Sequence, residues 1–176
     1  MRHLDGLHAF ALRLGRDPAT AERLVADATS RARAWWEHFQ LGTDVRVWLF
    51  TLLFAQWRTA RRPSDASVPD DDIGGEAAPA TSLDGVAELD PEGRVYDAVA
   101  DEELVVTLDS LPDAYRVQLL LSDVHHFSYA EAAEVLGLPE GTMRERLHRG
   151  RDLLQKRLVG YAVAMGRLEL PARPPG

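Results

Sequence analysis

The chain has 176 residues, of which 28 are acidic and 20 basic, so its formal net charge at neutral pH is −8, and it contains no cysteine. Without cysteine it can hold no disulfide, thiolate metal site or cysteine nucleophile, which fits a reducing cytoplasm. A chain of this length forms one domain or two small ones. An average charge of −8 argues against nucleic-acid binding unless the acidic residues lie away from the binding surface.

The acidic residues are in fact concentrated in the middle of the chain. Between Pro63 and Glu103 there are thirteen of them and a single base, Arg94, so this stretch carries −12 and the remainder +4. Its first part is rich in Pro, Gly, Ala, Ser and Asp and lacks periodicity, which predicts a flexible linker or a plain solvated tether. We therefore expect the following organisation: a helical domain at 1–62, an acidic linker at 63–99, a second helical domain at 100–163 and a flexible tail at 164–176.

The N-terminal part predicts three helices. The first covers roughly Leu4–Leu14, and the second begins after Asp17, which can cap it, with Pro18 in its first turn. It should reach about Phe39, with Trp35 and Trp36 buried or partly buried. A third helix should follow the break at Gly42–Asp44 and end near Arg62, because a proline comes next.

The third helix is apolar nearly all round. One stripe, Trp48, Leu49, Leu52 and Leu53, is expected to face the core, and a second contains Val47, Phe50, Phe54 and Trp57. A second apolar stripe needs something to cover it. We consider extruded single-stranded bases, which stack on aromatic rings, a protein partner, or the chain's own C-terminal domain; the alternative is that the stripe completes a small core.

The C-terminal part predicts a helix pair followed by a helix-turn-helix. Ser128 and Glu131 have the spacing of a capping box, the helix they open should stop at Gly137, and Pro139 suits the start of the next helix. That last helix has one apolar face, formed by Met143, Leu147, Gly150, Leu154 and Leu158. Arginines near its first half suit the DNA major groove, although a solvated charged face is an equally simple interpretation.

The run from Phe127 to Leu154 resembles region 4 of the extracytoplasmic-function (ECF) RNA polymerase sigma factors. The matching residues are Leu111-Pro112, Tyr129, Glu131, Ala133, Leu136-Gly137, Gly141-Thr142, Leu147 and Arg149. The resemblance implies binding of the minus-thirty-five promoter element and the polymerase flap. Glu145 departs from the pattern, since the family usually has a small polar or basic residue at this position. A carboxylate that faces DNA phosphates is repulsive.

The N-terminal helices resemble region 2 of the same family. The matching residues are Arg16-Asp17-Pro18, Ala21-Glu22, Leu24-Val25, Asp27, Arg33-Ala34-Trp35, Trp48-Leu49 and Arg61-Arg62. Arg23 and Ala26 depart from the pattern on the helix that would meet the polymerase clamp. Thr51, Phe54 and Ala55 depart from it where the family often has polar residues that serve promoter melting. The resemblance also implies that the linker threads toward the polymerase cleft.

These resemblances give three sets of candidate site residues. For minus-thirty-five-like DNA they are Ser128, Tyr129, Glu140, Thr142, Arg144, Glu145, His148 and Arg149. For minus-ten-like DNA they are Phe50, Phe54, Trp57, Arg58, Arg61 and Arg62. For core polymerase they are Glu22, Arg23, Asp27, Arg31 and Trp35.

Catalysis has little support, because the chain lacks a Gly-rich phosphate loop, a nucleophile elbow and a His-Glu-x-x-His motif. His125 and His126 with Asp123 form the one ligand-like cluster, but adjacent histidines on a helix point to different sides. We expect no enzyme activity, metal or cofactor. The N-terminus does not look like a signal peptide, and the apolar run Val45–Trp57 contains Arg46 and is too short to span a bilayer.

The sequence thus predicts an all-α protein of two small helical domains, with three helices in the first and four in the second. The expected function is that of a cytoplasmic alternative sigma factor, which binds core RNA polymerase and directs promoter recognition and transcription initiation. The expected partners are core polymerase, promoter DNA and an anti-sigma factor. A sigma-like protein that binds polymerase or an anti-sigma factor without opening promoters is the alternative, and a free-standing helix-turn-helix repressor is a third.

Overall fold

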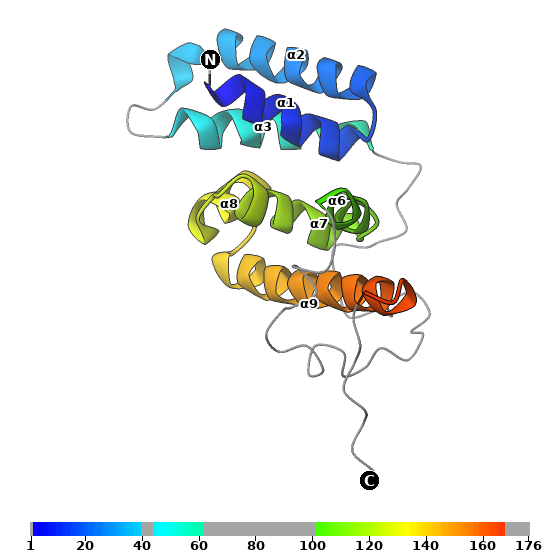
Figure 1. The fold of residues 1–176 in the computed structure, drawn as a ribbon. Coiled ribbons are helices and arrows are strands. Elements are labelled where there is room, and N and C mark those ends of the chain that lie inside the picture. The colour runs from blue at the N-terminus through cyan, green and yellow to red at the C-terminus, as the bar shows by residue number, and fades with distance from the viewer. Residues whose placement is uncertain (1, 40–43, 62–100, 168–176) are drawn as a thin grey trace. The chain divides into compact units, whose positions relative to one another are not determined.

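A computed structural model describes residues 2–39, 44–61 and 101–167, and all regular elements within these ranges are helical (Figure 1). They are the helices α1 (Arg2–Gly15), α2 (Pro18–Ala34), the 3-10 turn η1 (Trp36–His38), α3 (Val45–Ala60), α6 (Asp101–Asp109), α7 (Asp113–Leu119), the π-helical turn η2 (Leu120–Val124), α8 (Tyr129–Leu136) and α9 (Glu140–Ala164). The all-α class, with three N-terminal and four C-terminal helices among the described residues, is confirmed. The expected linker at 63–99 and the tail beyond 167 lie outside the described residues.

The described residues form two compact units. The first unit combines the N-terminal helices with Leu120–Arg144, which contains η2, α8 and the first turn of α9. The second combines α6 and α7 with α9 from Glu145 onward.

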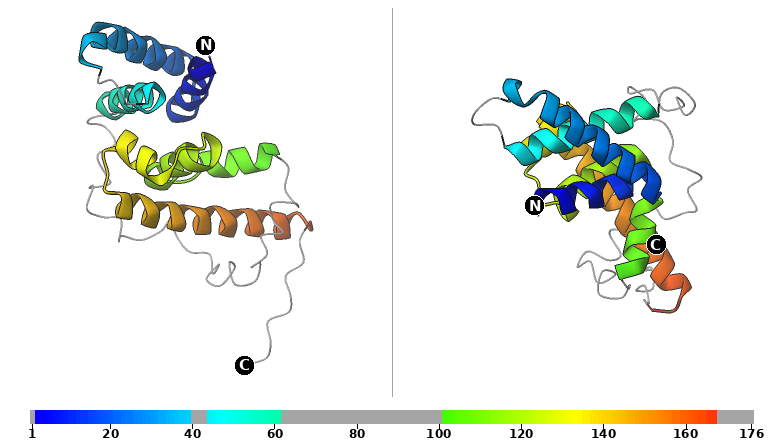
Figure 2. Two further views of the ribbon diagram at one scale, coloured as in Figure 1. Left: turned by 90° about the vertical axis from the view of Figure 1, so that its left-hand side faces the viewer. Right: turned by 90° about the horizontal axis from the view of Figure 1, so that it is seen from above.

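The three N-terminal helices pack against one another within the first unit (Figure 2). The turn between α1 and α2 is tight, since a Cβ on Gly15 would lie 2.7 Å from Cγ2 of Thr20. Asp17 caps α2 as expected, because its carboxylate accepts a hydrogen bond from the backbone N–H of Thr20 at 2.8 Å. Hydrogen bonding from the side chain of Thr20, and then from its backbone N–H, stabilises the ionised carboxylate, so the pKa of Asp17 lies below its usual value.

The core face of α3 is formed by Leu53 of the stripe expected there together with three residues of the second stripe, as in the alternative that this stripe completes a small core. Its buried residues are Val47, Phe50, Leu53 and Trp57, whereas Trp48, Leu49 and Leu52 remain partly exposed. The expectation was wrong because both stripes are apolar, so their hydrophobicity could not show which one α1 and α2 would cover.

The end of α2 also differs from the expectation. The helix stops at Ala34 and is followed by the 3-10 turn η1, so it does not run on to Phe39. Trp35 and Trp36 are 62% and 58% exposed, which contradicts their predicted burial. Trp36 instead stacks on Phe39 with ring centroids 5.3 Å apart, and Phe39 lies 5.0 Å from Trp48.

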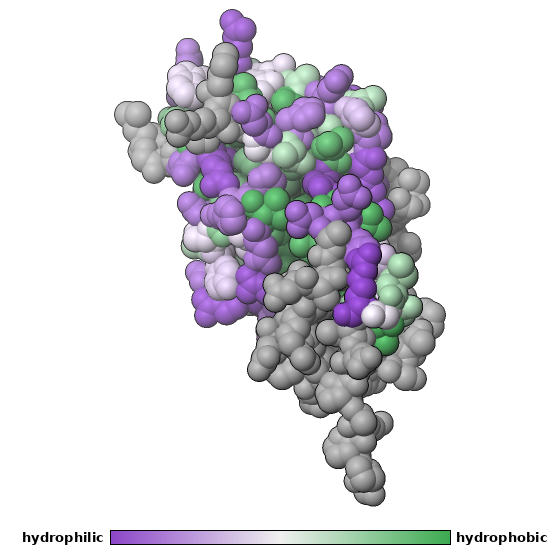
Figure 3. All heavy atoms as spheres, in the orientation of Figure 1, coloured by the Kyte–Doolittle hydropathy of each residue, from purple (hydrophilic) through white to green (hydrophobic). Residues whose placement is uncertain are grey.

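The second unit brings α6 and α7 against the long helix α9. Gly150 allows a close approach, because a Cβ at this position would lie 3.3 Å from Leu119 and 3.3 Å from Tyr115 of α7. Arg157 of α9 donates hydrogen bonds to the backbone carbonyl and the hydroxyl oxygen of Ser110. On the face drawn in Figure 3, hydrophilic residues gather over much of the described surface.

Candidate nucleic-acid interface

The helix-turn-helix begins with the capping box that the sequence predicts. The Ser128 hydroxyl accepts from the Glu131 N–H at 3.3 Å, and the Glu131 carboxylate accepts from the Ser128 N–H at 2.8 Å. Hydrogen bonds from Ser128 hold the pKa of Glu131 below its usual value. Gly137 ends α8 with a φ of 67°, a left-handed conformation that glycine adopts without strain.

The long helix α9 has the predicted apolar face. Met143, Leu147, Gly150, Leu154 and Leu158 are all buried, so the spacing of three and four residues identified the inner side of this helix correctly. The helix begins at Glu140, immediately after Pro139. Its outer side is therefore available for a ligand along the first turns, where the candidate DNA-binding residues lie.

All eight residues predicted for minus-thirty-five-like DNA are exposed or partly exposed. Within the first unit, the guanidinium of Arg144 lies 5.6 Å from the ring centroid of Tyr129. Arg144 also donates to the carboxylate of Glu140 at 2.9 Å. The structure thus brings together three of these residues, one from α8 and two from the start of α9.

Two acidic residues of α9, Glu140 and Glu145, form ion pairs with its arginines. Arg149 donates to Glu145 at 2.6 Å, and the spacing of four residues is the same as for Arg144 and Glu140. Exposed pairs of this kind contribute little stability. In the free protein they lower the positive charge of the outer side, so DNA phosphates would compete with Glu140 and Glu145 for the same guanidinium groups.

Four of the five residues predicted for polymerase binding lie on α2, and the fifth, Trp35, is the C-cap of that helix. Glu22, Arg23, Asp27, Arg31 and Trp35 are all exposed. The opposite side of the same helix is buried, through Ala21, Leu24, Ala28 and Ala32. This arrangement leaves the candidate polymerase surface free of the unit's own core.

The aromatic residues predicted for minus-ten-like DNA are mostly buried. Phe50 is 1% and Trp57 8% exposed, while Phe54 is partly exposed and Arg58 and Arg61 are exposed; Arg62 lies outside the described residues. The indole of Trp57 donates to the backbone carbonyl of Leu14 at 3.0 Å. The buried rings therefore have no open face for a base in this arrangement.

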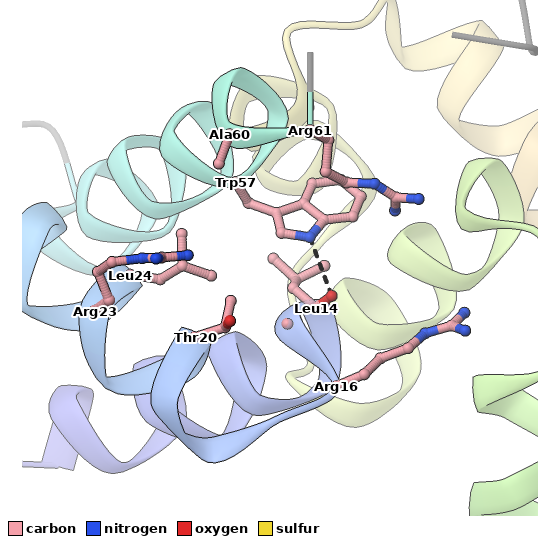
Figure 4. A pocket seen from close by; sticks show the side chains of 9 residues that line it. Leu14, Arg16, Thr20, Arg23, Leu24, Trp57, Ala60 and Arg61 are labelled. Carbon is pink, nitrogen blue, oxygen red and sulfur yellow. Dashed lines mark hydrogen bonds between the residues drawn. The ribbon is translucent and has the colours of Figure 1, made fainter. Parts of the chain in front are cut away.

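A pocket of about 320 Å³ lies where the α1–α2 turn meets the end of α3 (Figure 4). Trp57 and Leu24 contribute apolar walls, and three arginines, Arg16, Arg23 and Arg61, line it. The Arg61 guanidinium is 4.9 Å from the Trp57 ring centroid. The pocket joins Arg23 of the predicted polymerase surface to Arg61 of the predicted minus-ten surface, and its positive lining favours an anionic group.

Sequence reasoning missed a cluster formed by Arg46, Phe50, His125 and Phe127 within the first unit. Arg46 donates a hydrogen bond to the backbone carbonyl of His125, and its guanidinium lies 4.0 Å from the Phe127 ring centroid. Burial, and then the charges of Arg46 and His126, lower the pKa of His125 to about 4. The sequence contained one indication of this cluster, because Arg46 is an isolated charge in an apolar run.

In the part of the chain that the structure describes, no group of three or more His, Cys, Asp or Glu side chains is placed to hold a metal ion. None of the helices in that part is both long and apolar enough to cross a membrane.

Comparison with known proteins relates both halves of the chain to one group. Residues 101–154 match the family described as sigma-70, region 4. Over 152 residues the chain is 34% identical to the ECF RNA polymerase sigma factor EcfG of Rhodopseudomonas palustris, covering 86% of this chain and 78% of that protein. It is 29% identical to SigW of Bacillus subtilis over 159 residues, 88% of this chain and 83% of that one.

Solved structures show the same likeness. The sigma factor RpoE in complex with the anti-sigma factor NepR from Bartonella quintana matches with a TM-score of 0.65 and 28% identity, over 90% of this chain and 92% of that one. CnrH in complex with the cytosolic domain of CnrY matches with a TM-score of 0.61 at 22% identity, over 90% and 84% of the two chains, which is a likeness of fold.

Proposed function

Because the chain belongs to the ECF family of RNA polymerase sigma factors, we propose that it binds core RNA polymerase and directs it to promoters. It acts in the cytoplasm, where polymerase works, and it needs no catalytic residue or cofactor of its own. The observation that carries this proposal is the helix-turn-helix, which lies inside the matched region and presents eight exposed or partly exposed candidate residues on α8 and α9.

Within this function, α9 reads the minus-thirty-five-like element. The side chains of Arg144 and Arg149 are 65% and 49% exposed on the outer side of the helix. A guanidinium matches the paired acceptors of guanine in the major groove and also binds phosphate. The exposed residues of α2 and its C-cap, from Glu22 to Trp35, bind the polymerase, and their mixed charges would set the register of that contact.

The partner in the resting cell is an anti-sigma factor. One structure with this fold, that of RpoE with NepR, is a complex of a sigma factor with an anti-sigma factor. Exposed aromatic residues are frequent in protein interfaces, and in this chain Trp35 and Trp36 are exposed at the end of α2.

The alternative function, polymerase or anti-sigma binding without promoter opening, is favoured by one observation. Phe50 and Trp57 are buried, and the departures at Thr51, Phe54 and Ala55 leave α3 with few polar groups for unpaired bases. The two functions predict opposite results in a run-off transcription assay.

The test is run-off transcription with core polymerase on genomic promoters, with polymerase binding measured in parallel. Promoter-dependent transcript, lost in Arg144→Ala with polymerase binding unchanged, supports the sigma-factor function. Polymerase binding without transcript from any promoter supports the alternative. Absence of polymerase binding would refute the sigma-factor function and would limit the alternative to binding of an anti-sigma factor.

A further inference from the structure

The pocket between the α1–α2 turn and the end of α3 is built entirely from the three N-terminal helices. Its walls come from residues between Leu14 and Leu24 and from Trp57, Ala60 and Arg61 of the α3 end, all of which belong to the first compact unit. Its volume of about 320 Å³ lies at the lower end of the range for small-molecule sites. It therefore has room for a compact ligand.

The pocket is positively charged in a chain that is acidic overall. Three arginines and no acidic residue are among its nine lining residues, so the lining carries +3, against −8 for the whole chain. Asp17 lies next to the pocket and attracts Arg23, but one carboxylate offsets only one of the three charges. A concave site lined by charge of one sign concentrates ions of the opposite sign, so this pocket favours an anion.

The three guanidinium groups are distributed around the pocket. Figure 4 shows the Arg23 side chain across from those of Arg16 and Arg61, with Thr20 and the Trp57 indole between them. A ligand with a single charged group can meet one end of this arrangement. A ligand with two linked anionic groups can meet both ends, and the Thr20 hydroxyl adds a neutral donor between them.

The walls of the pocket are held in place by contacts with α1. The Trp57 indole donates to the backbone carbonyl of Leu14 at 3.0 Å, and the Arg61 guanidinium lies 4.9 Å from the centroid of the Trp57 ring. Arg16 has a φ of 61° and its N–H bonds to the Leu12 carbonyl at 2.9 Å, which closes the end of α1. A site that is already ordered loses less affinity to the ordering of its own side chains when a ligand binds.

We propose that this pocket binds a small molecule that carries a diphosphate group. A guanidinium donates two parallel hydrogen bonds to a phosphoryl group, and such charge-assisted bonds are about twice as strong as neutral ones. A diphosphate presents two phosphoryl groups to the two ends of the pocket. Its several negative charges also relieve the repulsion among Arg16, Arg23 and Arg61, which a singly charged carboxylate does less well.

The ligand would also regulate the protein, a consequence that rests on the proposed function. Arg23 belongs to the surface proposed to bind the polymerase, and both Arg23 and Arg61 line this pocket. A diphosphate bound by Arg23 withdraws this residue from the polymerase contact. Ligand and polymerase therefore compete, and each lowers the affinity of the protein for the other by the same factor.

Binding can be followed in the full-length protein by NMR at the indole N–H of Trp57, with inorganic pyrophosphate as the probe in magnesium-free buffer. The chain has four tryptophans, and Trp48 lies nine residues before Trp57 on α3, roughly 14 Å along the helix axis. Pyrophosphate should shift the Trp57 signal in a saturable way and leave the Trp48 signal unchanged. Raising the salt concentration should weaken binding, because the arginines are exposed.

Two variants test the pocket, and a third is a matched control. Arg16→Gln removes one guanidinium outside the proposed polymerase and promoter surfaces, and it should weaken pyrophosphate binding by about tenfold or more. Ala60→Leu fills part of the pocket without a change in charge and should also weaken binding. Arg33→Gln removes an exposed arginine about 15 Å from Arg23 along α2 and should have little effect. An unchanged Trp57 signal in each free variant shows that the pocket is still folded.

The same titration distinguishes a small diphosphate from other anions. Weaker binding of citrate than of pyrophosphate supports a phosphoryl site, and equal binding overturns it. A short DNA duplex that shifts Trp57 more strongly than pyrophosphate, with the same dependence on Arg16, assigns the pocket to the DNA backbone and overturns the proposal. It is also overturned if millimolar pyrophosphate leaves Trp57 unshifted, or if Arg33→Gln weakens binding as much as Arg16→Gln.

Competition with the polymerase is measured separately, so that the pocket and the proposed function are tested independently. Saturating pyrophosphate should lower the affinity of the wild-type protein for core polymerase and should have much less effect on Arg16→Gln. This comparison cancels any action of pyrophosphate on the polymerase itself. Equal effects on both proteins overturn the competition. Saturable binding at Trp57 in a protein that does not bind polymerase supports the diphosphate site and refutes the sigma-factor function.

Discussion

Acidification should lower the unfolding free energy of the first unit by protonating His125. The size of the effect follows from the surroundings of this side chain. The imidazole is 9% exposed, packs between Phe10 and Phe50, and its Nε2 has no hydrogen-bond partner among the described residues. Burial therefore favours the neutral ring, and the charges of Arg46 and His126 add to the effect, so the pKa falls from 6.5 to about 4.

Linkage between protonation and folding determines whether the unfolding free energy rises or falls with pH. The folded protein resists protonation of His125 and the unfolded chain does not, so the stabilisation is fully present above pH 6.5 and is lost as the pH falls toward about 4. With these two pKa values, the unfolding free energy at pH 5 should be about 2 kcal/mol lower, through this one group, than at pH 8.

The assay is urea unfolding of the wild-type protein and of His125→Phe at both pH values. All four tryptophans lie between the C-cap of α2 and the last turn of α3, so tryptophan fluorescence reports the first unit. The five other histidines are common to both proteins, so their contributions cancel in the comparison. The wild-type protein should lose about 2 kcal/mol more than the variant between pH 8 and pH 5. Equal losses in the two proteins would refute the account of His125 as a buried, neutral side chain.

Three further outcomes are expected from the helix-turn-helix. Ser128→Ala should lower the unfolding free energy by about 1 kcal/mol in a denaturant titration, because the Glu131 N–H loses its cap; no change would mean that water replaces the cap fully. Gly150→Ala should destabilise the second unit by roughly 1–3 kcal/mol, because a Cβ would crowd α7, and it should lower the melting temperature of the C-terminal helices. Glu145→Ser should tighten binding to promoter duplex and steepen its salt dependence, because it frees Arg149 for a phosphate; weaker binding in a fluorescence anisotropy titration would instead show that Glu145 contacts a base.

Local chemistry explains why much of the C-terminal half could be predicted. The ends of α8 depend on Ser128, Glu131 and Gly137, which act within a few residues of the chain. The buried face of α9 follows from the helical repeat alone, since its outer side is strongly polar. Asp17 and Pro18 define the start of α2 for the same reason. The order of the two family resemblances then indicated the family, which the comparison with EcfG confirms.

Residues whose environment depends on a distant partner were predicted poorly. Both stripes of α3 are apolar, so burial of Phe50 rather than Leu52 was decided by what packs against the helix. Trp35 and Trp36 were expected to be buried, but α2 ends at Ala34 and η1 changes the direction of the chain. No local pattern marked either outcome.

The sequence by itself determined the all-helical class, the caps at Asp17 and Ser128, the turn at Gly137 and the polar outer side of α9, because each depends on backbone hydrogen bonds and periodicity over a few residues. The tertiary structure decided that the π-helical turn η2 and the left-handed His126 bring His125 and Phe127 to α3. It also decided that Arg46 meets them across 79 positions of the chain. Such a contact depends on packing between segments far apart in sequence, and a single charged residue in an apolar run indicates that a partner is needed without indicating which one.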